Sequence, residues 1–213
     1  MRLRAKSDRK AALSEDQWQV DSSMRARFPN WPKEPLVFGA LSLDQRGQWH
    51  IYGDIIRHAD VRKRLNHHYH ADNQGRWYFQ NGPQRLYVDL AYTPWVFHLD
   101  RDSQLRTQTG HRVQFVKSVW LDENGAMIFD SEHGPGLLRE DALFSVLEKL
   151  CDRHGKSMCG NPLDPGLALY GQPTKPKLYL AWGGRRLPVG WIHSRIVGFK
   201  FKFIDRPGAF TVA

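Results

Sequence analysis

The sequence predicts an α+β protein in which short strands outnumber helices. From Leu36 to Asp130, aromatic and β-branched segments alternate with Asn-Gly, Thr-Pro and Thr-Gly turns, a pattern typical of β-sheets. Two segments, 57–70 and 137–152, instead carry apolar residues at helical spacing. Aromatic residues make up 12% of the chain, which suits sheets that bury flat rings.

Length and composition limit the class of protein. A chain of 213 residues forms one large domain or two small ones. No apolar run approaches the roughly 20 residues of a membrane span, and the N-terminus lacks the apolar core of a secretory signal. Cys151 and Cys159 are too few for a disulfide framework and lack zinc-site spacing. We therefore expect a cytoplasmic protein without membrane insertion.

Four regions follow from the changes in pattern along the chain. Residues 1–35 form a basic arm ended by prolines, and residues 36–71 form a first strand-strand-helix unit. Residues 72–154 read as an antiparallel sheet capped by the helix over 137–152. Residues 155–213 read as a Gly- and Pro-rich excursion followed by a basic β extension.

The β extension has two expected parts. Residues 177–191 predict a hairpin that turns at Gly183-Gly184. Residues 195–204 predict an alternating strand with Phe199, Phe201 and Phe203 on one face and lysines on the other.

An internal similarity indicates duplication. Leu43-Asp44-x-x-Gly47 and Leu121-Asp122-x-x-Gly125 each precede a strand and then a helix, with a four-residue insertion near His133 in the second copy. Strand-turn-strand-helix is a common unit, so chance similarity is an alternative, and the shared turn favours duplication.

No catalytic signature stands out in the sequence. We therefore expect a non-enzymatic protein, and the sequence does not exclude catalysis. His67, His68 and His70 suggest a metal at first, with Asp72 nearby, but histidine also suits a helix C-terminus, and we predict no metal site and no cofactor. Neither cysteine lies in a motif that would activate its thiol.

The basic charge is concentrated near the C-terminus. Residues 171–213 hold eight Lys or Arg against one Asp, or +7 of the net +9. Such a field attracts phosphates. An alternative anion or nucleic-acid site therefore comprises Arg185, Arg186, Lys200 and Lys202.

Residues 39–150 resemble the uncharacterised proteobacterial family called domain of unknown function 1285. The resemblance rests on GQWHIYGDIIRHADVRKRL, DNQGRWYF, GPQRLYVDLAYTPWVF and GHRVQF, which are similar to that family's motifs. The chain departs from them at Gln84, at Leu90-Ala91 and after His111. The resemblance implies a duplicated core whose second half is a curled, pleckstrin-homology-like sheet capped by a helix. It also implies a nucleotide-like ligand between the halves and a role in signalling, with no established catalytic residues.

We therefore expect a ligand-binding regulatory or signalling protein whose pathway the sequence does not name. The expected ligand is small and anionic. Arginines would neutralise it, aromatic rings would stack on it, and polar groups would orient it. The candidate residues are Asn81, Gln84, Arg85, Asp89, Trp77, Trp95, His111 and Arg112. Two alternatives stay open: a nucleic-acid-associated protein that uses the C-terminal strands, and a protein-interaction adaptor.

Overall fold

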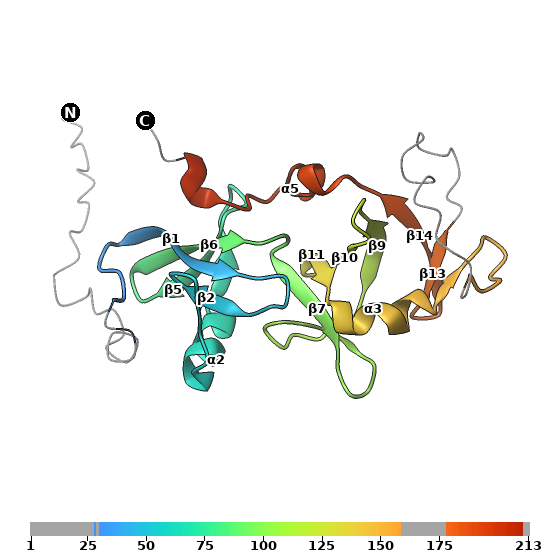
Figure 1. Ribbon diagram of the computed structural model, residues 1–213, viewed down its shortest axis with the longest axis horizontal. Helices are drawn as coiled ribbons and strands as arrows, with labels where there is room; N and C mark the ends of the chain where they lie inside the picture. The colour runs from blue at the N-terminus through green and yellow to red at the C-terminus, as the bar shows by residue number, and fades with distance from the viewer. Residues whose placement is uncertain (1–27, 29, 159–177, 211–213) are drawn as a thin grey trace, which may run out of the picture.

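Two β-sheets lie side by side along the longest axis of the molecule, each with a helix beside it (Figure 1). The computed structural model describes residues 28, 30–158 and 178–210. Most of the regular structure is strand, with a few short helices, so the predicted α+β class is confirmed. No helix in these described ranges is long and apolar enough to cross a membrane.

The first sheet has six strands in the order β3-β2-β1-β6-β5-β4. β1 and β6 are parallel, and the other neighbours are antiparallel. Helix α2, Ala59–His67, connects β3 to β4. The strands are β1 Leu36–Leu43, β2 Trp49–Ile51, β3 Asp54–Ile55, β4 Tyr69–Ala71, β5 Trp77–Asn81 and β6 Gln84–Leu90.

The second sheet has eight strands in the order β12-β13-β14-β9-β10-β11-β7-β8. β14 pairs with β9 in parallel, and β11 pairs with β7 in parallel. Helix α3, Glu140–Leu147, lies between β11 and β12. The strands are β7 Trp95–Leu99, β8 Leu105–Thr107, β9 Val116–Leu121, β10 Met127–Ser131, β11 Gly134–Leu138, β12 Leu150–Cys151, β13 Tyr179–Trp182 and β14 Arg185–Trp191.

The two sheets share one topology. The order β11-β10-β9-β14-β13-β12 repeats β3-β2-β1-β6-β5-β4, with the same sense of pairing at each step. We call the six-stranded sheet with α2 the first unit and the eight-stranded sheet with α3 the second unit. In both units the helix follows the third strand of the repeated set. Descent from one duplicated unit and the pleckstrin-homology likeness stay predictions. The first sheet takes strands from both sides of residue 71, and the division into domains also stays a prediction.

The capping helix is shorter than its sequence pattern predicts. The pattern extends over 137–152, but Gly134–Leu138 pairs with β10 and β7, and Leu150–Cys151 pairs with β13. Sheet partners on both sides thus limit the helix to two turns. Its buried residues are Ala142 and Val146, and Leu147 is only partly buried.

The predicted strand over 195–204 is wrong. The chain instead forms a 3-10 turn, η2 Ser194–Ile196, and helix α5, Val197–Phe201, whose C-cap residue Lys202 has φ +58°. β14 already has β13 on one side and β9 on the other, so the alternating segment finds no free sheet edge there. Tertiary context overrides a weak strand preference.

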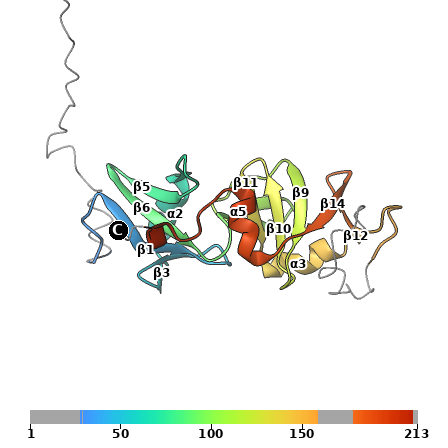
Figure 2. The ribbon, with the colours of Figure 1, turned by 90° about the horizontal axis from the view of Figure 1, so that it is seen from above.

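The predicted hairpin at Gly183-Gly184 is present, but it is no extension. β14 pairs with β9, and Leu187 and Val189 are buried. The hairpin therefore completes the second sheet. Beyond α5 the chain returns to the first sheet, where the Leu90 N–H donates to Asp205 O at 2.8 Å and the Ile204 N–H donates to Gly75 O at 2.9 Å (Figures 1 and 2).

Five turns are built in one way. In each, an Asp accepts hydrogen bonds at Oδ1 from the backbone N–H groups two and four residues later. The residue three positions on has positive φ, and it is Gly in four turns and Ser103 in the fifth. The five turns begin at Asp44, Asp72, Asp100, Asp122 and Asp152.

Burial along β1 gives a direct test of the core. Leu41 is fully buried, whereas Leu36 on the same strand is 55% exposed. We expect Leu41→Ala to lower the free energy of unfolding by about 2–5 kcal/mol, as in other emptied core sites. Leu36→Ala should change it by less than about 0.5 kcal/mol. Urea denaturation of both variants measures this, and equal costs would contradict the assigned register.

The Asp turns predict loss of stability in acid. Hydrogen bonds from Arg106 to Asp100, and from the Lys156 N–H to Asp152, hold the pKa of both carboxyls below the ordinary value. Burial acts to raise the pKa of Asp72, but hydrogen bonds from the Arg76 side chain and backbone outweigh it, so this pKa is also lowered. The stability from a lowered pKa is present above the unfolded value of about 3.9 and is lost as pH falls through the folded value.

We therefore expect the free energy of unfolding to hold between pH 7 and 5 and to fall below about pH 4. Asp72→Asn should reduce stability at pH 7 and make the acid loss smaller, because one linked carboxyl is gone. Urea titrations at pH 7, 5 and 3 measure both effects. An unchanged acid loss in Asp72→Asn would show that this turn carries none of it.

Candidate anion-binding site

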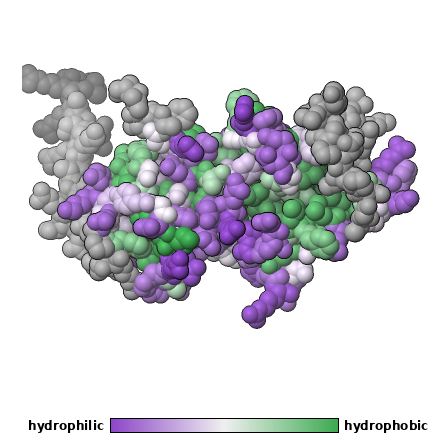
Figure 3. Space-filling model, viewed as in Figure 1, coloured by the Kyte–Doolittle hydropathy of each residue, from purple (hydrophilic) through white to green (hydrophobic). Residues whose placement is uncertain are grey.

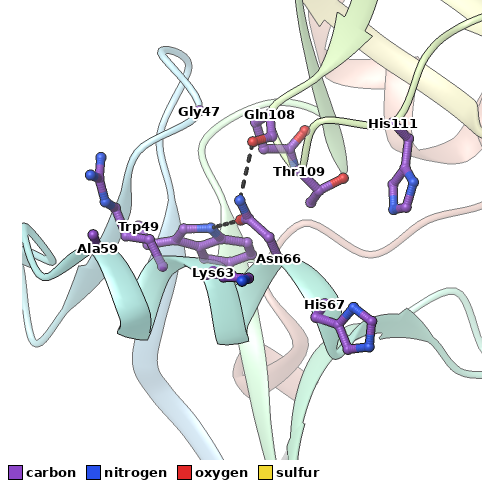
Figure 4. A pocket seen from close by; sticks show the side chains of 10 residues that line it. Gly47, Trp49, Ala59, Lys63, Asn66, His67, Gln108, Thr109 and His111 are labelled. Carbon is purple, nitrogen blue, oxygen red and sulfur yellow. Dashed lines mark hydrogen bonds between the residues drawn. The ribbon is translucent and has the colours of Figure 1, made fainter.

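A pocket of about 500 Å³ opens between helix α2 and the loop after β8, where the two units meet (Figure 4). One wall comes from the first unit and the other from the second. Its lining residues are Gly47, Trp49, Ala59, Arg62, Lys63, Asn66, His67, Gln108, Thr109 and His111.

Helical spacing places five of these residues on one face of α2. Ala59, Arg62, Lys63, Asn66 and His67 lie at positions i, i+3, i+4, i+7 and i+8, which share one side of a helix. Val61 and Leu65 belong to the opposite face and are fully buried. The amphipathic pattern that fixes the helix on the sheet thus turns its polar face to the pocket.

A chain of hydrogen bonds crosses the junction and forms the floor. Trp49 Nε1 donates to Asn66 Oδ1 at 2.7 Å, and Asn66 Nδ2 donates to Gln108 O at 3.4 Å (Figure 4). The Gln108 side chain is held in turn, since it donates to Pro94 O at 3.2 Å and accepts from the Val96 N–H at 2.9 Å. These bonds set the distance between the helix and the loop.

The loop uses a variant of the Asp turn in which Thr107 takes the place of the Asp. The His111 N–H donates to Thr107 Oγ1 at 3.0 Å, and the Gly110 N–H donates to Thr107 O at 2.9 Å. Gly110 has φ +92°. The turn therefore presents Thr109 and His111 at the mouth of the pocket in a fixed conformation.

Positive charge on one wall is unpaired. In the parts of the chain that the structure describes, no ion pair or side-chain hydrogen bond involves Arg62 or Lys63, and both side chains are exposed. Asp60 on the same helix lies 3.9 Å from His58. His67 and His111 lie at one end of the opening (Figure 4). Two free cations beside polar loop groups suit an anion.

An aromatic cluster packs beside the pocket and joins the two sheets. Trp77 and Trp95 ring centroids are 5.1 Å apart, and Tyr69 contacts both. Tyr69 Oη donates to Pro94 O at 3.0 Å, and Trp95 Nε1 donates to His133 O at 2.7 Å. Trp77 and Trp95, predicted to stack on a ligand, thus pack against other rings.

Asn81 and Gln84 are buried in the first unit and do not line this pocket. Gln84 Oε1 accepts from Trp31 Nε1 at 2.9 Å, and Gln84 Nε2 donates to Pro32 O and Glu34 O at 2.9 and 2.8 Å. Gln84 therefore fixes the end of the N-terminal arm to β6. The Asn81 amide is fully buried without a hydrogen-bond partner.

Arg85, Asp89 and Arg112 have separate surroundings. Arg85 donates to Gln80 Oε1 at 3.1 Å, and Arg112 donates to Gln104 Oε1 at 2.8 Å in the second unit. Burial raises the pKa of Asp89, partly opposed by Arg206. Of the eight predicted residues, His111 alone lines the pocket between the units, and the groove centred on Arg85 stays a prediction.

The four basic residues of the alternative anion or nucleic-acid site contact different parts of the protein. The Arg185 guanidinium lies 4.8 Å from the Phe115 ring centroid, and Arg186 donates to Arg153 O at 3.0 Å. Lys200 Nζ lies 3.9 Å from the Trp120 ring centroid, and Lys202 ends α5. Lys175 and Lys177, which contribute to the predicted basic field, lie outside the described residues.

The histidine cluster does not share a helix face, because α2 ends at His67 and His70 lies on β4. Within the described ranges, no group of three or more His, Cys, Asp or Glu residues could hold a metal ion. Cys151 is a buried free thiol, as its place in the apolar pattern indicates, and Cys159 lies outside those ranges.

The pocket residues that sequence reasoning missed carry one signal, the polar stripe at 59, 62, 63, 66 and 67. Any solvated helix face gives such a stripe, so the pattern alone does not indicate a site. Gln108 and Thr109 carry no signal, because only the folded chain brings them opposite α2.

Comparison with known proteins identifies relatives without known function. The DUF2944 family model, described as a protein of unknown function (DUF2946), matches residues 20–208. No curated protein matches the chain. The crystal structure of a DUF1285 family protein from Silicibacter pomeroyi DSS-3 is similar, with a TM-score of 0.46, 11% identity, and 72% of this chain and 80% of that chain covered.

A DUF1285 family protein from Shewanella baltica OS155 is also similar, with a TM-score of 0.38 and 16% identity. The match covers 50% of this chain and 88% of that one. The distant resemblance to the DUF1285 family is thus confirmed.

Close contact between the units at Gly47 gives a test of the junction. Gly47 has φ +78°, and a Cβ there would lie 2.8 Å from Gln108 Cβ. We expect Gly47→Ala to cost about 1–3 kcal/mol from strain and contact together. Gly53→Ala is the matched control, because Gly53 has φ +87° with no atom within 4 Å of a new Cβ. Thermal unfolding measures the stability of both variants. Equal losses of stability in the two variants would contradict the close contact at Gly47.

Proposed function

Because the chain belongs to the DUF2944 family of proteins of unknown function, its function has to be argued from its own residues, and we propose that it binds a small anionic ligand in the pocket between α2 and the loop after β8. A phosphate-bearing, nucleotide-like compound fits this proposal. Binding would regulate a process in the cytoplasm, without catalysis by this chain.

The observation that carries the proposal is the pair of unpaired cations, Arg62 and Lys63, on the wall of a preformed pocket. Adjacent residues of a helix do not face each other, so neither cation interacts with the other. An anion between α2 and the loop would give both side chains a partner of opposite charge. The volume of about 500 Å³ lies within the range of small-ligand sites.

The position of the pocket supports regulation. It takes one wall from each unit, so a bound ligand adds contacts across the junction. Any such ligand stabilises the joined arrangement of the two units by mass action.

Ligand binding can be measured by thermal unfolding against inorganic phosphate, nucleotides and other small phosphates. A ligand at 100 times its Kd stabilises the protein by about 2.7 kcal/mol, or roughly 5–10 °C in Tm for a chain of this size. The double variant Arg62→Ala, Lys63→Ala should lose this rise and keep the unliganded Tm, because both side chains are exposed and unpaired.

Two controls locate the site. Arg185→Ala, Arg186→Ala removes two other exposed arginines and should keep the full rise. Arg85→Ala tests the groove predicted from sequence. If Arg85→Ala abolishes the rise and the Arg62, Lys63 variant keeps it, the ligand binds at that groove instead. If no phosphate compound changes the Tm, the proposed function is wrong.

A further inference from the structure

Helix α5 holds a large apolar side chain away from the protein. Phe199 is 89% exposed and Ile196, at the end of η2, is 50% exposed. Their neighbours Val197 and Phe203 are 1% and 7% exposed, so the segment is anchored on its inner side. In Figure 3 the surface over α5 shows apolar residues directly beside hydrophilic ones.

Hydrogen bonds and a cation–π contact hold the segment that carries Phe199 in one conformation. Ser194 donates to the Glu123 carboxylate from its backbone N–H at 2.8 Å and from its hydroxyl at 2.6 Å. The hydrogen bond from the Ser194 hydroxyl is the largest contribution that lowers the pKa of Glu123 to about 2, so this anchor stays ionised. Lys200 lies over the Trp120 ring, and the Phe203 N–H donates to Gly198 O at 3.0 Å.

Cationic residues flank the apolar pair along the chain. Between His193 and Gly208 the chain has Arg195, Lys200, Lys202 and Arg206, against Asp205 alone. Arg195, Lys202 and Arg206 are exposed, and among the described residues no ion pair involves their side chains. Glu123, in the turn between β9 and β10, already accepts from Ser194 and lies 3.3 Å from His193.

We propose that this surface, Ile196 and Phe199 with Arg195 and Lys202, docks the protein onto an anionic phospholipid surface. The apolar side chains would enter the boundary between headgroups and acyl chains, and the cations would contact the headgroup phosphates. The charge is complementary to anionic lipid. Docking of this kind places the protein on the membrane without crossing it.

The test uses the full chain and sedimentation with vesicles of phosphatidylcholine, with and without about one third phosphatidylglycerol. Binding should require the anionic lipid and weaken as salt is raised. Phe199→Ser should lower the partition coefficient about tenfold, as expected for a large apolar side chain kept from burial. Arg195→Gln, Lys202→Gln should lower it about 25-fold, because each cation near such a surface contributes about a fivefold factor.

Phe144→Ser provides the matched control. Phe144 on α3 is 72% exposed, but its helix carries Glu140 and Asp141 in the first turn. This variant should keep full binding. Equal binding to uncharged vesicles, no binding to anionic vesicles, or equal losses in Phe144→Ser and Phe199→Ser would each overturn the proposal.

A single-stranded oligonucleotide tests the other polyanion that this surface could bind. If the Phe199 and Arg195, Lys202 variants lose oligonucleotide binding while vesicle binding is absent, the partner is nucleic acid and the lipid proposal is wrong. The thermal response to small phosphates should be the same in these variants as in the unmodified protein, so the outcome is independent of the pocket.

Discussion

Each repeated set of six strands depends on the parallel pairing of its first and last strands, β1 with β6 and β9 with β14. Parallel strands cannot be joined by a tight turn, so the chain between them has to leave the sheet and return. In both units it forms two antiparallel strands, a helix and two further strands on the way. The helix then lies beside the sheet and buries its apolar side, Val61 and Leu65 in one unit and Ala142 and Val146 in the other.

The Asp turns make these returns short and specific. An Asp that accepts two backbone N–H groups supplies acceptors that a tight turn otherwise lacks, and the residue with positive φ lets the chain reverse. The second carboxylate oxygen often fixes a nearby side chain, as in Asp72 with Arg76, Asp100 with Arg106 and Asp122 with Tyr92. A turn of this kind therefore fixes the reversal of the chain, and where the second oxygen is bonded it also positions a side chain next to it.

The junction combines a rigid part and an open part. The aromatic rings of Tyr69, Trp77 and Trp95 fill the space between the sheets, and hydrogen bonds to Pro94 O fix the connection between them. Next to this packed core, the pocket lies between α2 and the turn that begins at Thr107. The C-terminal segment crosses from the second unit back to the first, so the same chain that carries Phe199 also ties the units together.

Local sequence determined the α+β class, the Leu-Asp-x-x-Gly turns, the hairpin at Gly183-Gly184 and the apolar stripe of α2, because turn chemistry and side-chain periodicity act over a few residues. Tertiary structure decided the rest. The segment 195–204 has the alternation of a strand but folds mainly as a helical turn, because β14, the strand that precedes it, already has β13 and β9 as its two neighbours. The polar face of α2 becomes a pocket wall only because the Gln108 loop packs opposite it, 42 residues away from Asn66 along the chain. Contacts between distant segments leave no periodic trace in either segment, and so the sequence did not reveal them.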